Sequence, residues 1–152
     1  MTKTEALQKL ADIALAQVGT KEVGGNNRGP KIVQYQKATW LDPAPWPWCA
    51  AFVCWCIREW LEVPGVAEAV GVAQASLWRP QTAGAWDFAR WAKQHRLEVV
   101  DEDHDARAGD LIIFDFSHIG IVVGAAPAGS GTVSTVEGNT NGKGDRDSNS
   151  GD

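Results

Sequence analysis

The first apolar residues of the chain recur at helical spacing. Between Leu7 and Val18 they lie three or four positions apart, behind a Thr2-x-x-Glu5 box of the kind that caps helices. Gly19 follows, and glycine commonly ends a helix. The pattern therefore predicts a helix that begins after Thr2 and ends before Gly19.

The most hydrophobic helical pattern runs from Cys49 to Leu61. Three prolines between Asp42 and Trp48 exclude regular structure just before it, because proline lacks an N–H donor and fixes φ. The first nine residues of the pattern are apolar on every side, which predicts a helix inside the domain. Cys49 is therefore expected at the N-terminus of the most buried helix.

The second half of the chain changes its period. After further helical patterns around 32–38 and 85–92, short runs of branched residues bounded by turn residues predict strands at 97–100, 111–114, 118–123 and 132–136. Helices first and strands afterwards predict an α+β fold with a small antiparallel sheet packed on the Cys49 helix. We expect one domain over 1–141 and a flexible or truncated polar tail over 142–152.

Composition and charge exclude several classes of function. With 152 residues and a net charge of −5, the chain fits a single domain and lacks the basic surplus of a nucleic-acid binder. Its longest apolar run, Cys49 to Ile57, is too short to cross a bilayer, so we expect no membrane insertion. The N-terminus lacks the apolar core of a secretory signal, so we expect synthesis in the cytoplasm and a non-secretory route of release.

Neither a disulfide framework nor a metal site is expected. The three cysteines, Cys49, Cys54 and Cys56, are odd in number, and C-x4-C-x-C is not a zinc spacing. The segment Asp145-x-Asp147-x-Asn149 opens like a calcium loop, but its glycine comes one position late and no bidentate Glu follows. We therefore expect no metal and no cofactor.

The predicted position of Cys49 favours a nucleophilic thiol. The reactive form of cysteine is the thiolate, which the free N–H groups and dipole at a helix start stabilise. The alternative is that all three cysteines only fill space in the core, as buried free cysteines usually do. We accept that alternative for Cys54 and Cys56, and position alone leaves it open for Cys49.

A thiol nucleophile needs a base, and His118 is the candidate. Histidine exchanges protons near neutral pH, and His118 begins a predicted strand directly after a turn. The other two histidines lie in polar segments. Glu137 and Asn139 are two positions apart on an extended segment, so both are candidates for fixing the imidazole tautomer. The alternatives are a structural strand histidine and an exposed strand end.

Four segments together resemble one family. They are Pro47-Trp48-Cys49-Ala50-Ala51-Phe52-Val53, Gly109-Asp110-Leu111-Ile112-Ile113-Phe114, His118-Ile119-Gly120-Ile121-Val122 and Glu137-Gly138-Asn139-Thr140. Their order is similar to that of CHAP domains, the cysteine- and histidine-dependent amidohydrolases and peptidases related to the NlpC-type cell-wall peptidases. The resemblance spans about residues 5–141, and Glu22, Asn26, Asn27 and Tyr35 also look like the family's N-terminal region.

The resemblance implies a papain-like fold and a catalytic set of Cys49, His118, Glu137 and Asn139. It implies that Cys49 attacks an amide of bacterial peptidoglycan, as an N-acetylmuramoyl-L-alanine amidase or an endopeptidase. Glu137 would orient His118, and Asn139 would share that role or bind substrate.

The expected biological role is bacterial lysis, with the chain acting as a monomer. Release by a phage endolysin route through a holin and injection as an effector are both consistent with the sequence. The alternatives are a cysteine amidase acting on a small amide outside the wall and an inactive wall-binding module.

Aromatic residues near the nucleophile are candidates for substrate binding. The chain has eight tryptophans, and Trp46 and Trp48 lie next to Cys49 in sequence, where they are expected to form the walls of a groove. Tyr35 is assigned to the same role. The remaining tryptophans are expected in the core: Trp40, Trp55, Trp60, Trp78, Trp86 and Trp91.

Overall fold

The computed structural model describes residues 1–100, 105–124 and 130–140. The helices in these residues are α1 (Lys3–Leu15), α2 (Pro30–Gln36), α3 (Cys49–Glu62), α4 (Val66–Ala69), α5 (Ala75–Trp78) and α6 (Asp87–Gln94). The strands are β1 (Leu111–Phe114), β2 (His118–Gly124) and β3 (Ser134–Glu137). The polar tail expected over 142–152, with its Asp145-x-Asp147-x-Asn149 segment, lies outside the described residues.

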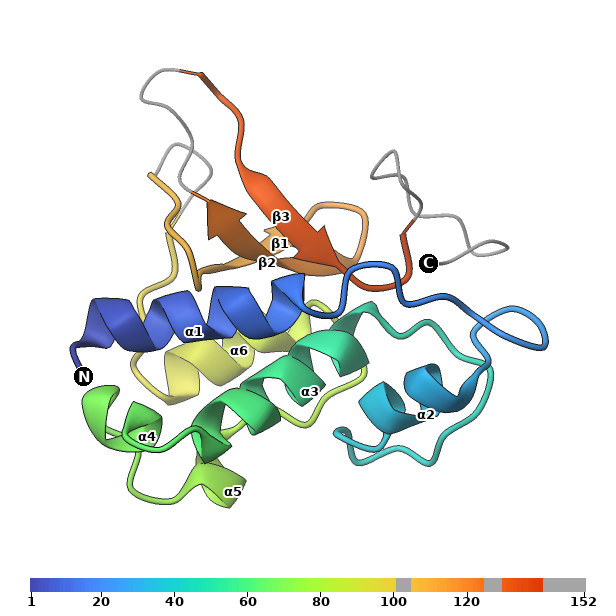
Figure 1. The fold of residues 1–152 in the computed structure, drawn as a ribbon, viewed down its shortest axis with the longest axis horizontal. Helices are drawn as coiled ribbons and strands as arrows, with labels where there is room; N and C mark the ends of the chain where they lie inside the picture. Colours follow the sequence, from blue (N-terminus) through green and yellow to red (C-terminus); the bar gives the residue numbers. More distant parts are fainter. Residues whose placement is uncertain (101–104, 125–129, 141–152) are drawn as a thin grey trace.

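Helix α3 is the centre of the domain. It contacts α1, α2, α4 and β2, and α1 packs beside it against the same sheet (Figure 1). These neighbours on several sides explain why almost every residue of α3 is buried and why its sequence is apolar all round. The predicted α+β fold, with an antiparallel sheet on the Cys49 helix, is confirmed.

Helix α1 begins as its sequence predicts. The backbone N–H of Glu5 donates to Oγ1 of Thr2 at 3.1 Å, and the backbone N–H of Thr2 donates to Oε2 of Glu5 at 2.6 Å. Two N–H groups that the helix leaves unpaired are thereby satisfied. The helix ends at Leu15, and the chain turns before Gly19, whose φ of 95° suits glycine.

The sheet has the order β1-β2-β3, and both pairings are antiparallel. The register places Phe114 opposite His118 and Gly120 opposite Glu137. Since side chains two positions apart share a face of a strand, His118, Gly120 and Glu137 lie on the same face of the sheet. The sheet therefore brings the imidazole and the carboxylate to one end of the same surface.

One predicted strand is wrong. Three of residues 97–100 have branched apolar side chains, but the segment forms no strand and is exposed. Just after α6 ends, Arg96 adopts a φ of 59°, and the N–H of Leu97 donates a hydrogen bond back to the carbonyl oxygen of Ala92 at 2.8 Å. The segment therefore leaves the helix along the surface, where no strand of the described residues pairs with it, and β propensity alone does not make a strand.

The tryptophans divide differently from the prediction. Trp55 and Trp60 are buried, and Trp78 and Trp91 are partly buried and packed edge to face. Two others were expected in the core but lie at the surface, since Trp40 is 78% exposed and Trp86 is 54% exposed. Both belong to loops beside helices rather than to the buried face of one, which explains why burial does not follow from residue type.

Candidate active site

Cys49 is the first residue of α3 and is 4% exposed. The residue before it, Trp48, makes no side-chain cap to the helix, so no capping side chain occupies the N–H groups of the first turn. These groups and the helix dipole favour negative charge at this end of the helix. The local structure therefore suits a thiolate at Cys49.

The other two thiols have a different environment. Burial raises the pKa of Cys54 to about 12, and its thiol donates to the carbonyl oxygen of Thr82 at 3.3 Å. Burial also raises the pKa of Cys56 well above its usual value. Both thiols stay protonated inside the core near neutral pH, which agrees with the prediction that they only fill space.

His118 begins β2 directly after the turn that follows β1, and its side chain has no exposed area. Its ring stacks on Phe116 with 5.6 Å between centroids and lies 5.7 Å from the ring of Phe114. Backbone pairing with Phe114 fixes the position of the residue, and the two aromatic rings fix the orientation of the imidazole. The turn and its aromatic residues thus hold His118 rigidly.

Glu137 forms an ion pair with His118. Its Oε1 lies 3.0 Å from Nε2 of the imidazole, and the carboxylate side chain is 11% exposed. A Cβ at the facing residue, Gly120, would lie 2.5 Å from Cγ of Glu137. Glycine at position 120 therefore leaves the space through which the Glu137 side chain reaches His118.

The surroundings of His118 keep its imidazole protonated. Burial by itself lowers the pKa of His118, but contacts with Cys49 and Glu137 outweigh burial and raise it from 6.5 to about 9. Because Nε2 faces Glu137, Nδ1 is the nitrogen that remains for the sulfur. An imidazolium beside sulfur is the arrangement that stabilises a thiolate nucleophile.

Thr135 completes this chain of contacts and was missed by the sequence analysis. Its hydroxyl donates to Oε2 of Glu137 at 3.0 Å, so each carboxylate oxygen has a partner of its own. Thr135 and Glu137 are two positions apart on β3 and therefore lie on one face. That spacing was the available signal, but a threonine in a strand is too common to stand out.

Asn139 lies just beyond β3 and is completely buried, with a φ of 57°. Neither Oδ1 nor Nδ2 of its amide has a hydrogen-bond partner among the described residues. Gly138, between Asn139 and Glu137, passes so close to α3 that a Cβ there would lie 2.8 Å from side-chain atoms of Phe52 and Trp48. The structure thus assigns the contact with His118 to Glu137 and leaves the amide of Asn139 unpaired.

Two residues expected to bind substrate lie in the core instead. Trp48 is 2% exposed, and its indole N–H donates to Oε1 of Glu22 at 2.8 Å. Tyr35 is fully buried, stacks on Trp48 and donates its hydroxyl to Gln17 at 2.8 Å. The polar group at the edge of each ring forms a hydrogen bond inside the protein, so both side chains can be buried next to the start of α3.

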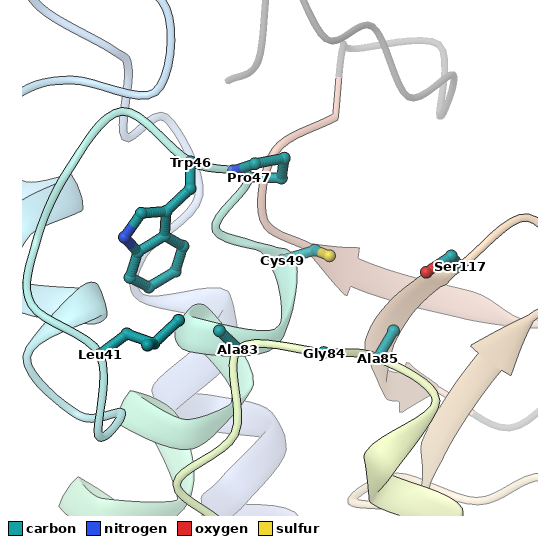
Figure 2. A pocket seen from close by; sticks show the side chains of 8 residues that line it. All are labelled: Leu41, Trp46, Pro47, Cys49, Ala83, Gly84, Ala85 and Ser117. Carbon is teal, nitrogen blue, oxygen red and sulfur yellow. The ribbon is translucent and has the colours of Figure 1, made fainter.

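A groove opens beside the sulfur of Cys49. Its volume is about 190 Å³, and Trp46 is one of the residues that line it. Figure 2 shows the sulfur pointing from the start of α3 toward Ser117, with Trp46 and Leu41 on the other side. The described residues that line it are Leu41, Trp46, Pro47, Cys49, Ala83, Gly84, Ala85 and Ser117.

Other kinds of site are not found in the described part of the chain. No group of three or more His, Cys, Asp or Glu side chains that could hold a metal ion occurs there. None of the helices within the described ranges combines the length and apolar character needed to span a membrane.

Comparison with known proteins agrees with this geometry. A family model described as the CHAP domain matches residues 41–139, a stretch that includes Cys49, His118, Glu137 and Asn139. No curated protein and no solved structure matches the chain significantly. Because the family model covers well over half of the sequence, the chain belongs to the CHAP-domain family, the cysteine- and histidine-dependent amidohydrolases and peptidases.

Proposed function

We propose that this chain is a peptidoglycan hydrolase that cuts an amide bond of the stem peptide, as a muramoyl-alanine amidase or an endopeptidase. The observation that carries the proposal is the line of contacts from Cys49 through His118 to Glu137, at the side of an open groove. The groove is partly open to solvent, so a polymer can approach the Cys49 side chain from outside.

In the first half of the reaction Cys49 becomes acylated. The sulfur forms a bond to the amide carbonyl carbon while its proton resides on His118, and the C–N bond then breaks as His118 gives that proton to the departing nitrogen. Glu137 holds the imidazole in the orientation that serves both transfers.

In the second half water releases the product. His118 takes a proton from a water molecule, whose oxygen attacks the thioester carbon, and the C–S bond breaks to give a carboxylic acid and to restore the thiolate beside the protonated imidazole. The same imidazole thus acts as base in one step and as acid in the other. Contacts with the rings of Phe114 and Phe116 keep the imidazole in place between the steps.

The oxyanion of each tetrahedral intermediate is stabilised at the start of α3. Backbone N–H groups there, including that of Cys49, point toward the charge that develops on the carbonyl oxygen. The amide of Asn139 is completely buried and is not among the residues that line the groove, so we assign it no direct contact with the substrate.

Digestion of purified bacterial sacculi tests the proposal. Wild-type protein should release soluble muropeptides, and mass spectrometry of the products identifies the bond. Muramoyl ends without stem peptides indicate an amidase, whereas new free amines within the stems indicate an endopeptidase. Cys49→Ala should release nothing while its circular dichroism spectrum stays that of the wild type. Intact sacculi after incubation with folded wild-type protein would contradict the proposal.

A further inference from the structure

One part of the groove is lined by a segment without helix or strand. Residues 79–86 connect α5 to α6, and Ala83, Gly84 and Ala85 from this segment line the space beside the Cys49 sulfur (Figure 2). The segment pairs with no strand of the described residues, and none of the three lining residues has a side chain longer than a methyl group. Their position in the groove therefore depends on contacts made by the residues on either side of them.

Thr82 bridges the lining residues with its hydroxyl group. The hydroxyl donates to Oδ2 of Asp87, the first residue of α6, at 2.7 Å, and it accepts from the backbone N–H of Gly84 at 3.0 Å. A single hydroxyl can serve as donor and acceptor at once. A Cβ at Gly84 would lie 3.0 Å from Oδ2 of Asp87 and 3.7 Å from Oγ1 of Thr82. The bridge between Thr82 and Asp87 is therefore in contact with the middle of the lining residues.

The backbone around Thr82 is attached to other parts of the groove. The thiol of Cys54, in α3, donates to the carbonyl oxygen of Thr82 at 3.3 Å. The N–H of Trp40 donates to the carbonyl oxygen of Gln81 at 3.0 Å, and Trp40 directly precedes Leu41, another lining residue. Thr82 thus joins the helix that carries the Cys49 sulfur, through its carbonyl group, to the start of α6, through its hydroxyl group.

We propose that Thr82 is a positioning residue for substrate binding, whose hydroxyl holds residues 83–85 in place beside the Cys49 sulfur. This inference rests on the hydrolase function proposed above. Without the hydroxyl, Gly84 and Asp87 lose a hydrogen-bond partner, so the lining residues gain freedom that substrate binding must then remove. Among the described residues no hydrogen bond joins Thr82 to His118, so substrate binding weakens while proton transfer is preserved.

The kinetics of Thr82→Val and Thr82→Ser test this role on the muropeptide that the wild type cleaves. Valine keeps the shape of the side chain but lacks the hydroxyl, so we expect KM to rise about three- to tenfold. The value of kcat should stay within about twofold, and the alkaline limb of kcat/KM should not move. Serine keeps the hydroxyl and should restore KM. A merely structural role lowers the folded fraction without changing KM, so a wild-type KM in folded Thr82→Val would overturn the proposal.

Asp87→Ala breaks the same bridge from its other end, and Arg90→Ala is the matched control. Asp87 contacts Thr82 through Oδ2 and Arg90 through Oδ1, the latter at 4.0 Å. Both charged side chains are well exposed, so the fold should tolerate either change. We expect Asp87→Ala to raise KM as Thr82→Val does, whereas Arg90→Ala should change KM less than about twofold. Equal KM values in the two variants would overturn the assignment. A wild-type protein without turnover would instead contradict the proposed hydrolase function, and this inference with it.

Discussion

At the scale of single residues, the three thiols show how position decides reactivity. Cys49 occupies the start of α3 beside an imidazolium, whereas Cys54 and Cys56 lie deeper in the same helix, where burial raises the pKa of each thiol. The sequence analysis separated them in the same way, from their order along one apolar helix. It did not identify Thr135 as a partner of the Glu137 carboxylate, because only the folded structure shows the hydrogen bond between these two side chains on one face of β3.

Glu137→Gln should change the pH profile of the reaction. Catalysis needs protonated His118, so activity is present below the pKa of about 9 and is lost as the pH rises through it. Glu137 is one of the groups that raise this pKa, so its neutral analogue should move the alkaline limb of kcat/KM to lower pH. We also expect activity to fall on the order of 10²-fold. An alkaline limb at the wild-type position would contradict the assigned role of Glu137.

Thr135→Val should reveal a positioning residue. The change keeps the shape of the side chain but removes the hydrogen bond to Oε2 of Glu137, so we expect kcat to fall about tenfold, as for one lost hydrogen bond to a charged group. Thr135→Ser keeps the hydroxyl and should restore most of the activity. The pH profiles of both variants should be recorded, because a purely structural role predicts no shift of the alkaline limb in Thr135→Val and no rescue by serine.

At the scale of elements, close approaches of the backbone to side chains decide where the proposed catalytic groups lie. Gly120 on β2 makes room for Glu137, and Gly138 lets the chain after β3 pass over α3. Neither glycine has a positive φ, so both are required by space rather than by backbone conformation. The family motif contains these glycines, but only the contacts in the folded chain explain them.

Gly138→Ala should destabilise the fold at this crossing. Its Cβ would lie 2.8 Å from side-chain atoms of Phe52 and Trp48, so α3 and the segment after β3 must separate, at a cost of about 1–3 kcal/mol in the free energy of unfolding. Gly124→Ala is the matched control, since the nearest atom to its Cβ would be 3.6 Å away in Ser134. Urea denaturation of both variants measures the difference, and equal midpoints would contradict the proposed crowding.

The elements themselves were largely predictable, and the exceptions have a common cause. Helices α1 and α3 follow from apolar periodicity and capping, and β1 and β2 follow from branched runs between turns. Residues 97–100 have the same composition as a strand but no partner strand. Exposure of Trp40 and Trp86 and burial of Tyr35 and Trp48 likewise depend on neighbours from distant parts of the chain. Such neighbours are not visible in local sequence.

At the scale of the whole molecule, the proposed catalysis requires two layers to meet. The helical layer supplies the sulfur at the start of α3, and the sheet supplies the imidazole and carboxylate from β2 and β3. Trp48, directly before α3, links this helix to the segment after β3, because its ring lies against Gly138. Its indole N–H also donates a hydrogen bond to Glu22 in the N-terminal loop. The site residues Cys49, His118 and Glu137 were predicted through the order of their motifs, whereas their supports emerged only from the packing of these layers.

The most direct test of the account compares one substitution at two cysteines. Cys49→Ser and Cys54→Ser both exchange sulfur for oxygen, but only the first changes the attacking atom, and a serine at 54 keeps a donor toward Thr82. We predict that the rate of muropeptide release from sacculi falls on the order of 10³-fold or more in Cys49→Ser. In Cys54→Ser it should stay within about tenfold of the wild-type rate. Near wild-type turnover by folded Cys49→Ser would contradict the central claim that this sulfur is the nucleophile.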